Sequence, residues 1–155
     1  PLVQYQLGRV AMLMNDPKTA LDRSEAEKQA NPNLADPYLL AAEAHALMQQ
    51  YSNCATEYQK AVKLRPQQAG IYVKMATCWR KSGNIDAARA MLAIAEKKES
   101  GLAEIYKEQG AIFEEKGQIN QAIESYNQYF ALAPDAPDRA QIEARISALQ
   151  RGQTP

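Results

Sequence analysis

Residues 35–68 read ADPYLLAAEAHALMQQYSNCATEYQKAVKLRPQQ, and this stretch decides the fold. In its first half, apolar side chains from Tyr38 to His45 recur at spacings of three and four residues, which place them on one face of an α-helix. A second run with the same spacing follows the turn-forming segment around Gln49. The stretch therefore predicts two helices that fold back on each other, because neither can bury its apolar face alone.

The same pattern returns every 34 residues along the chain. Pro32, Pro66 and Pro134 differ by 34 residues and by twice that number. Four blocks follow one another from residue 1 without insertion, at 1–34, 35–68, 69–102 and 103–136. We number the positions within each block from 1 to 34, so that Ala42, for example, stands at position 8 of the second block.

Several positions keep the same kind of residue in every block. Position 8 is small throughout, with Gly8, Ala42, Ala76 and Gly110, and so is position 20, with Ala20, Cys54, Ala88 and Ala122. Small residues let two helices approach closely. Position 15 has turn-forming residues, namely Asn15, Gln49, Gly83 and Gly117. Asp16-Pro17 and Asp36-Pro37 predict helix starts, because an acid can cap a helix that begins with proline.

The period and its residues resemble the tetratricopeptide repeat. The resemblance is carried by Leu7, Gly8, Ala20 and Pro32 in the first block, by Tyr38, Ala42, Tyr58, Ala61 and Pro66 in the second, and by Gly110, Ala122, Tyr126 and Pro134 in the fourth. It implies an all-α fold over residues 1–136, a right-handed superhelical α-solenoid of antiparallel helix pairs. Three residues depart from the family's pattern: Glu27 at a normally small position, Gln109 in place of leucine, and Ser100 in place of proline.

Residues 137–151 keep only one apolar stripe, formed by Ile142, Ile146 and Leu149. A helix of this kind, with a polar outer side, resembles the terminal helix that closes such solenoids and keeps them soluble. We therefore expect a C-terminal capping helix at 137–151, followed by a frayed tail at 152–155.

The composition of the chain excludes several classes of protein. Its 155 residues include 18 basic and 18 acidic side chains, and a net charge of zero counts against nucleic-acid binding. No apolar run approaches the roughly 18 to 20 residues of a membrane span, so we expect no direct membrane insertion. The chain begins at Pro1 without a methionine, which suggests a piece of a longer protein, and nothing in it indicates a cellular compartment.

Catalytic and metal-binding chemistry has little support in the sequence. His45 is the only histidine, so neither a histidine-dependent catalytic triad nor a multi-histidine metal site can be assembled without residues from another chain. Paired acids such as Glu104 and Glu108 are expected on an open helix face, where carboxyl groups are normally solvated. We therefore expect no enzymatic activity, no cofactor and no metal. Cys54 and Cys78 are expected to pack as small apolar residues, with a disulfide between them as a remote alternative.

The remaining candidate site is the face of each first helix that points away from the buried stripe, at positions 2, 5, 6, 9, 12 and 13. In stacked helix pairs this face lines the concave side, and we call it the inner wall. It is apolar in the first two blocks, basic in the third and acidic in the fourth, where the third block has six Lys or Arg against three Asp or Glu and the fourth has two against six. The predicted partner-binding residues on this wall are Tyr5, Arg9, Leu13, Leu39, Leu40, Glu43, Lys74, Thr77, Arg80 and Lys107.

This wall predicts a non-enzymatic scaffold or adaptor that binds a peptide or amphipathic helix of another protein. Tyr5, Leu39 and Leu40 would supply exposed apolar anchors, while Lys74, Arg80 and Lys107 would set the register of the partner. The alternative is a self-associating or spacing module of a larger secretion, pilus, envelope or signalling assembly, so homo-oligomers are possible. A helical-repeat RNA reader would need a basic groove, and the acidic fourth block argues against one.

Overall fold

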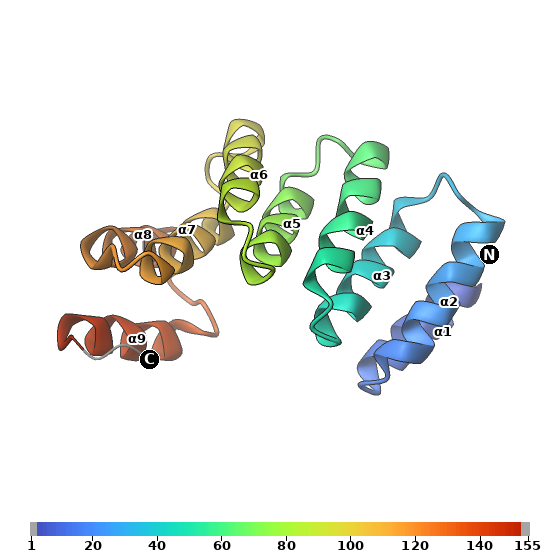
Figure 1. Ribbon diagram of the computed structural model, residues 1–155, viewed down its shortest axis with the longest axis horizontal. Helices are drawn as coiled ribbons and strands as arrows, with labels where there is room; N and C mark the ends of the chain where they lie inside the picture. Colours follow the sequence, from blue (N-terminus) through green and yellow to red (C-terminus); the bar gives the residue numbers. More distant parts are fainter. Residues whose placement is uncertain (1–2, 153–155) are drawn as a thin grey trace.

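The computed structural model describes residues 3–152, which fold into nine α-helices without a strand (Figure 1). The helices are α1 (Val3–Leu13), α2 (Pro17–Ala30), α3 (Ala35–Leu47), α4 (Tyr51–Leu64), α5 (Ala69–Lys81), α6 (Ile85–Lys98), α7 (Ala103–Glu115), α8 (Ile119–Leu132) and α9 (Arg139–Gln150). Residues 1, 2 and 153–155 lie outside the described part, so of the predicted frayed tail only Gly152 is described, and it lies in a turn.

Helices α1 to α8 form four pairs that stack in a row, and α9 packs against α8 at the C-terminal end (Figure 1). Each helix packs mainly on the helices before and after it, and α1 also contacts α3 and α5 contacts α7, so the contacts join helices of the same or of neighbouring repeats. This is the arrangement of a solenoid, in which neighbouring repeats bury each other's apolar faces. The predicted all-α solenoid is confirmed.

Close helix packing depends on the small residues at positions 8 and 20. A Cβ atom added at Gly110 would lie 2.6 Å from the ring of Tyr126, and one added at Gly8 would lie 2.6 Å from Cδ2 of Leu40. At position 20, all four side chains are fully buried, namely those of Ala20, Cys54, Ala88 and Ala122. Larger residues at these positions would push the helices apart.

The turn within each repeat lies at the predicted position. The residue at position 15 has a positive φ in all four repeats, with 57° at Asn15, 58° at Gln49, 87° at Gly83 and 69° at Gly117. The predicted cap at Asp16 is confirmed, since its carboxylate accepts a hydrogen bond from the main-chain nitrogen of Thr19 at 3.1 Å. The predicted cap at Asp36 is wrong, because α3 already begins at Ala35 and Asp36 instead pairs with Arg65.

Tyrosines at position 4 tie successive repeats together. The hydroxyl groups of Tyr38, Tyr72 and Tyr106 donate hydrogen bonds to main-chain carbonyl oxygens at 3.0, 3.2 and 3.2 Å. The acceptors are the residues at position 32 of the preceding repeat, namely Pro32, Pro66 and Ser100. Because the acceptor belongs to the main chain, serine at residue 100 leaves this contact intact.

Glu27, the charged residue at a normally small position, also has a structural role. Its buried carboxylate accepts hydrogen bonds from the main-chain nitrogen of Tyr5 at 3.1 Å and from the side chain of Asn31 at 2.5 Å. The first N–H groups of a helix have no acceptor within that helix. Glu27 therefore supplies an acceptor to the first turn of α1.

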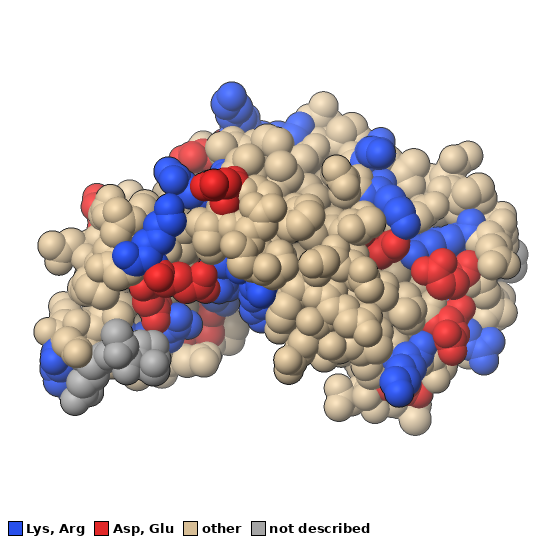
Figure 2. Space-filling model, viewed as in Figure 1, with Lys and Arg blue, Asp and Glu red and all other residues tan. Residues whose placement is uncertain are grey.

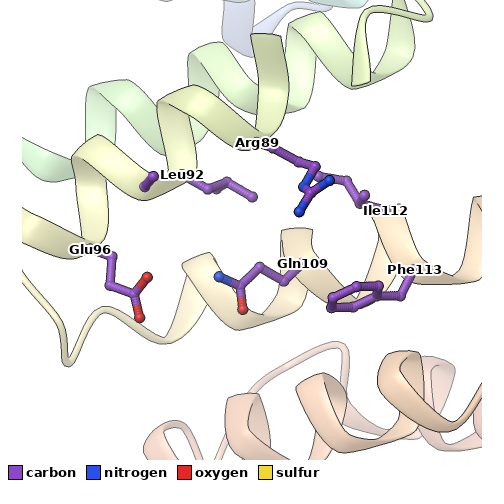
Figure 3. A pocket seen from close by; sticks show the side chains of 7 residues that line it. Arg89, Leu92, Glu96, Gln109, Ile112 and Phe113 are labelled. Carbon is purple, nitrogen blue, oxygen red and sulfur yellow. The ribbon is translucent and has the colours of Figure 1, made fainter. Parts of the chain in front are cut away.

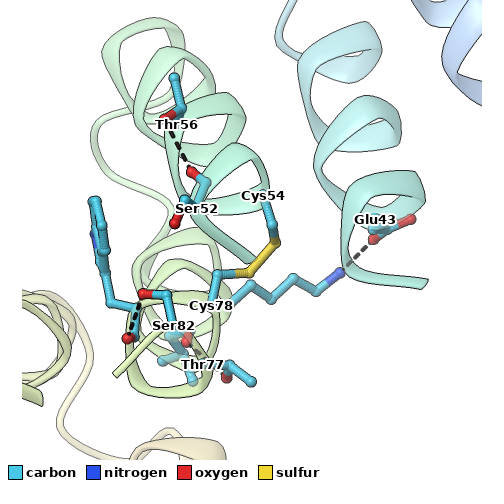
Figure 4. The surroundings of a disulfide bond; sticks show 10 residues. Glu43, Ser52, Cys54, Thr56, Thr77, Cys78 and Ser82 are labelled. Carbon is cyan, nitrogen blue, oxygen red and sulfur yellow. Dashed lines mark hydrogen bonds and ion pairs between the residues drawn. A yellow bond between two sulfur atoms is a disulfide. The ribbon is translucent and has the colours of Figure 1, made fainter. Parts of the chain in front are cut away.

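Cys54 and Cys78 form a disulfide that joins α4 to α5 (Figure 4). The expectation that they are free thiols in apolar packing is therefore wrong, although both side chains are buried. The two cysteines stand at position 20 of the second repeat and position 10 of the third, which face each other where the repeats meet. Their Cα atoms are 6.0 Å apart, within the range that a disulfide spans.

Candidate functional site

The molecule is an arch with a hollow between the end that holds α9 and the first repeats, and acidic and basic side chains lie next to one another on both arms of the arch (Figure 2). Among the predicted anchors, Leu40 is only 3 % exposed, so the expectation that it is available to a partner is wrong. The cause is Gly8, whose missing side chain leaves a space that the Leu40 side chain fills. Leu39 is half-buried and packs against the apolar cluster of the second and third repeats.

The apolar residues of the wall that remain accessible lie in the first two repeats. Leu13 is 86 % exposed, and Leu47, at the same position 13 of the second repeat, is 52 % exposed. Tyr5 is half-buried beside the exposed guanidinium of Arg9, whose carbon lies 5.9 Å from the centre of the tyrosine ring. Burial and the nearby carboxylate of Asp36 raise the pKa of the Tyr5 hydroxyl, so it stays protonated and can donate a hydrogen bond.

The predicted basic residues of the wall have carboxylate partners within the chain. Lys74 pairs with Glu43 at 2.7 Å (Figure 4), and Lys107 pairs with Asp138 at 2.5 Å. Arg80 pairs with two acids of the fourth repeat, Glu108 at 2.9 Å and Glu115 at 2.5 Å. Each of these pairs joins neighbouring segments of the solenoid, so a docking protein would have to displace an existing contact.

The opposite charges of the third and fourth blocks therefore help to hold these repeats together. Although burial alone would lower the pKa of Arg80, the carboxylates of Glu108 and Glu115 outweigh it and raise that pKa. Burial would raise the pKa of Asp138, but the hydrogen bonds from Lys107 and Tyr129 lower it. Burial and the bond to Asp138 raise the pKa of Tyr129 to about 12. The side chain of Thr77 is also engaged, since its hydroxyl donates to the carbonyl oxygen of Val73 at 3.2 Å.

A second apolar surface, on α1, was not predicted. Val3, Leu7 and Val10 are each about half exposed, although they form a single stripe along the helix. The same positions 3, 7 and 10 in the third repeat are Ile71, Met75 and Cys78, which are buried against the preceding repeat. The sequence pattern alone could have pointed to this stripe, because the same positions of the third repeat face the preceding repeat.

The described residues offer neither a metal site nor a membrane-spanning helix. Across residues 3–152, no three His, Cys, Asp or Glu side chains are grouped in a way that could hold a metal ion. None of the described helices is long and apolar enough to cross a membrane. His45 is half-buried, and its Nδ1 lies 2.7 Å from the side-chain oxygen of Gln50. The accessible features of the wall are thus suited to contact with another molecule.

Two of the four blocks match a known repeat family. Residues 35–68 and 103–136 match the family model of the tetratricopeptide repeat. Among curated proteins, the chain is similar to the probable UDP-N-acetylglucosamine-peptide N-acetylglucosaminyltransferase SEC of Arabidopsis thaliana, with 34 % identity over 80 residues. This match covers 52 % of the chain but only 8 % of the plant protein, so it carries no information about catalysis in this chain.

Solved structures share the architecture at low identity. TTC0263, a thermophilic TPR protein of Thermus thermophilus, has a TM-score of 0.79 at 18 % identity, over 95 % of this chain and 79 % of that one. MamA has a TM-score of 0.75 at 18 % identity, over 84 % and 77 % of the two chains. A chain of the APC/C hetero-tetramer Cut9-Hcn1 has a TM-score of 0.80 at 16 % identity, over 94 % of this chain and 28 % of that one. At these identities the likeness concerns the fold alone.

Proposed function

We propose that the chain binds a peptide or amphipathic helix of another protein along the inner wall of its first two repeats. Residues 35–68 and 103–136 match the tetratricopeptide repeat, a fold that generally serves as a non-catalytic module for protein interactions. The observation that carries the proposal is the exposure of Leu13 and Leu47 at equivalent positions of neighbouring repeats. Large apolar side chains that are exposed together commonly mark a contact site.

The chemistry of the wall suggests what kind of partner fits. Apolar side chains of the partner would contact Leu13, Leu47 and Tyr5, which provide an aromatic and two aliphatic surfaces. Within residues 3–152, Arg9 contacts the ring of Tyr5 and forms no ion pair, so its charge is open to a carboxylate. The expected partner is therefore an apolar segment with an acidic group, and its other contacts would extend over Glu43 and Lys74.

The test is a pair of substitutions, Leu13→Asp and Leu47→Asp, made together in the full chain. We expect proteins from the source organism that crosslink to the wild-type chain to be lost from this variant, because two carboxylates would be placed against an apolar segment. Leu132→Asp is the matched control, since Leu132 is an exposed leucine on α8. Retention of the same crosslinked proteins by the double variant would contradict the proposal. Leu40 is unsuitable for this test because its substitution would disturb the apolar cluster of the first two repeats.

One observation favours a second candidate function, that of a structural module in a larger assembly. The stripe of Val3, Leu7 and Val10 occupies positions that form the contact between repeats elsewhere in the chain. A further helix pair from another molecule could pack there in the same way. Sedimentation velocity at increasing protein concentration tests this candidate. Self-association that Leu7→Glu abolishes would support it, and a monomer at all concentrations would argue against self-assembly.

A further inference from the structure

A cleft of about 250 Å³ lies between α6 and α7, on the joint between the third and fourth repeats (Figure 3). It has an apolar base formed by Leu92, Ile112 and Phe113. Arg89 and Glu96 stand at its opposite ends, and the side chain of Gln109 reaches into the space between the two helices (Figure 3). The cleft is therefore apolar at its base and carries a positive charge at one end and a negative charge at the other.

The cleft exists because two residues of α6 differ from their counterparts in α4. At positions 21 and 28, α4 has Ala55 and Val62, which are buried in one apolar cluster with Ile71 and Met75 of α5. At the same positions, α6 has Arg89 and Glu96. Charged side chains stay in water rather than enter an apolar contact, so α6 and α7 do not close over these positions. Gln109 adds a polar group on the opposite helix, where the family usually has leucine.

The charges at the ends of the cleft are available to a ligand. Among the described residues, neither Arg89 nor Glu96 takes part in an ion pair or a side-chain hydrogen bond. The predicted cations of the inner wall beyond the first repeat differ in this respect, since Lys74, Arg80 and Lys107 already have carboxylate partners. The charged groups of the cleft are therefore more available to a ligand than these three cations, although the cleft lies outside the inner wall.

We propose that this cleft binds an amphipathic helix of another protein through one large apolar side chain that is flanked by an acidic and a basic residue. The volume favours a single side chain, because clefts that bury small-molecule ligands usually measure about 300 to 1,000 Å³. The inference rests on the proposed role of the chain in protein interactions, but it does not depend on the inner wall.

The spacing of Arg89 and Glu96 indicates that the ligand is a helix. Arg89 and Glu96 are seven residues apart on one helix, so they are separated by about 10 Å along its axis. A ligand helix with an acid, an apolar residue and a base at positions i, i+3 and i+7 presents all three side chains on one face with the same separation. Its acid would meet Arg89, its base would meet Glu96, and its apolar side chain would enter the cleft.

The probe is an alanine-based helical peptide with Glu, Leu and Lys at positions i, i+3 and i+7, titrated into the isotope-labelled full chain. We expect saturable chemical-shift changes at backbone amides of residues 89–96 and 109–113. The contact is small, so we expect weak binding, with a dissociation constant of about 1 mM. A peptide with Ala in place of Leu should bind about tenfold more weakly.

Charge reversals separate specific recognition from general apolar binding. Arg89→Glu should turn the preference toward a Lys/Leu/Lys peptide, and Glu96→Lys should turn it toward a Glu/Leu/Glu peptide, each by about tenfold. Lys97→Glu is the matched control for Arg89→Glu, since both replace a basic residue of α6 by glutamate and Lys97 does not line the cleft. The control should keep the wild-type order of preference. All three residues are exposed, so the variants should remain folded.

The proposal is overturned if the Glu/Leu/Lys peptide causes no saturable change at these amides up to about 10 mM, a concentration tenfold above the expected constant. It is also overturned if the charge variants keep the wild-type preference. If Leu13→Asp and Leu47→Asp abolish crosslinking and the peptide does not bind the cleft, the inner wall is supported as the partner site and the cleft is not. If the peptide binds the cleft and the leucine substitutions have no effect on crosslinking, the cleft is supported and the inner wall is not.

Discussion

The joint between α4 and α5 and the joint between α6 and α7 occupy equivalent places in the solenoid but are built differently. The first buries Ala55 and Val62, and the disulfide between Cys54 and Cys78 joins its two helices. The second has Arg89 and Glu96 at the same positions and contains an open cleft. Both joints follow from one repeat pattern, so the difference comes from a few side chains and leaves the backbone period unchanged.

This comparison shows how a repeat protein can acquire a site without changing its fold. Each repeat contacts only its neighbours, so a joint can be opened locally while the others remain packed. At the open joint, Leu92 still packs against Ile105 and Ile112 in one buried cluster. On the inner wall, Arg80 bridges the same two repeats through Glu108 and Glu115. An apolar contact on one side and ion pairs on the other thus hold the fourth repeat in place.

The largest expected effect comes from placing the charge of the open joint in the closed one. Ala55→Arg puts a guanidinium at a fully buried position within an apolar cluster. We expect the free energy of unfolding to fall by about 4 kcal/mol or more, through overpacking and the cost of an unpaired buried charge. Urea denaturation followed by circular dichroism measures this change.

The reciprocal substitution provides the control. Arg89→Ala removes an exposed side chain from the open joint, so its effect on the free energy of unfolding should stay within about 0.5 kcal/mol. A loss of less than about 1 kcal/mol for Ala55→Arg would mean that the closed joint tolerates a charged side chain at this position as well as the open joint does. The contrast between the two joints would then lose its physical basis.

A second prediction concerns the covalent link of the closed joint. Cys54→Ala together with Cys78→Ala should lower the free energy of unfolding by about 3 kcal/mol, because the disulfide closes a loop between cysteines 24 residues apart and restricts the unfolded chain. Both alanines fit the repeat pattern, since position 20 is alanine in the other three repeats and position 10 is alanine in the second repeat, at Ala44. Urea denaturation under oxidising conditions gives the difference.

A reducing agent supplies the matched measurement. Reduction should lower the stability of the wild-type chain to about that of the double alanine variant, and it should leave the variant unchanged. Equal stability of the wild-type chain with and without reductant, combined with two titratable thiols, would show that the link is absent in solution.

The sequence predicted the repeat well because the repeat depends on residue size at fixed spacings. Small residues at positions 8 and 20 are needed wherever two helices approach closely, so the period is visible without any structure. The turn at position 15 was predictable for a similar reason, since glycine and asparagine adopt a positive φ most readily. Gln49 has the same conformation and was recognised only through its place in the period.

The details of the site were less predictable because they depend on contacts between repeats. Leu40 was assigned to the open wall by its helical angle, but its environment is set by Gly8, which lies 32 residues earlier. Lys107 was predicted to contact a partner, but in the structure it pairs with Asp138. The cleft could have been found from the sequence, since Arg89 and Glu96 stand at the positions of Ala55 and Val62. That comparison requires knowing which positions face the next repeat.

The smallest of the three effects is expected from Arg80→Met, which tests what holds the open joint on its inner side. The Arg80 side chain is 14 % exposed and that of Glu108 is 11 % exposed, so removing the guanidinium leaves a nearly buried carboxylate without its cation. We expect the free energy of unfolding to fall by about 2 kcal/mol, less than for a fully buried pair because water still reaches these groups. Glu108→Gln in the same chain should restore part of the loss, since it removes the unpaired charge.

Lys74→Met is the control at an exposed pair that also joins two repeats, and its cost in the free energy of unfolding should stay below about 1 kcal/mol. If both methionine variants lost the same small amount of stability, the apolar contact of Leu92 with α7 would be sufficient to hold the open joint, and the charges of the third and fourth repeats would have no structural role there.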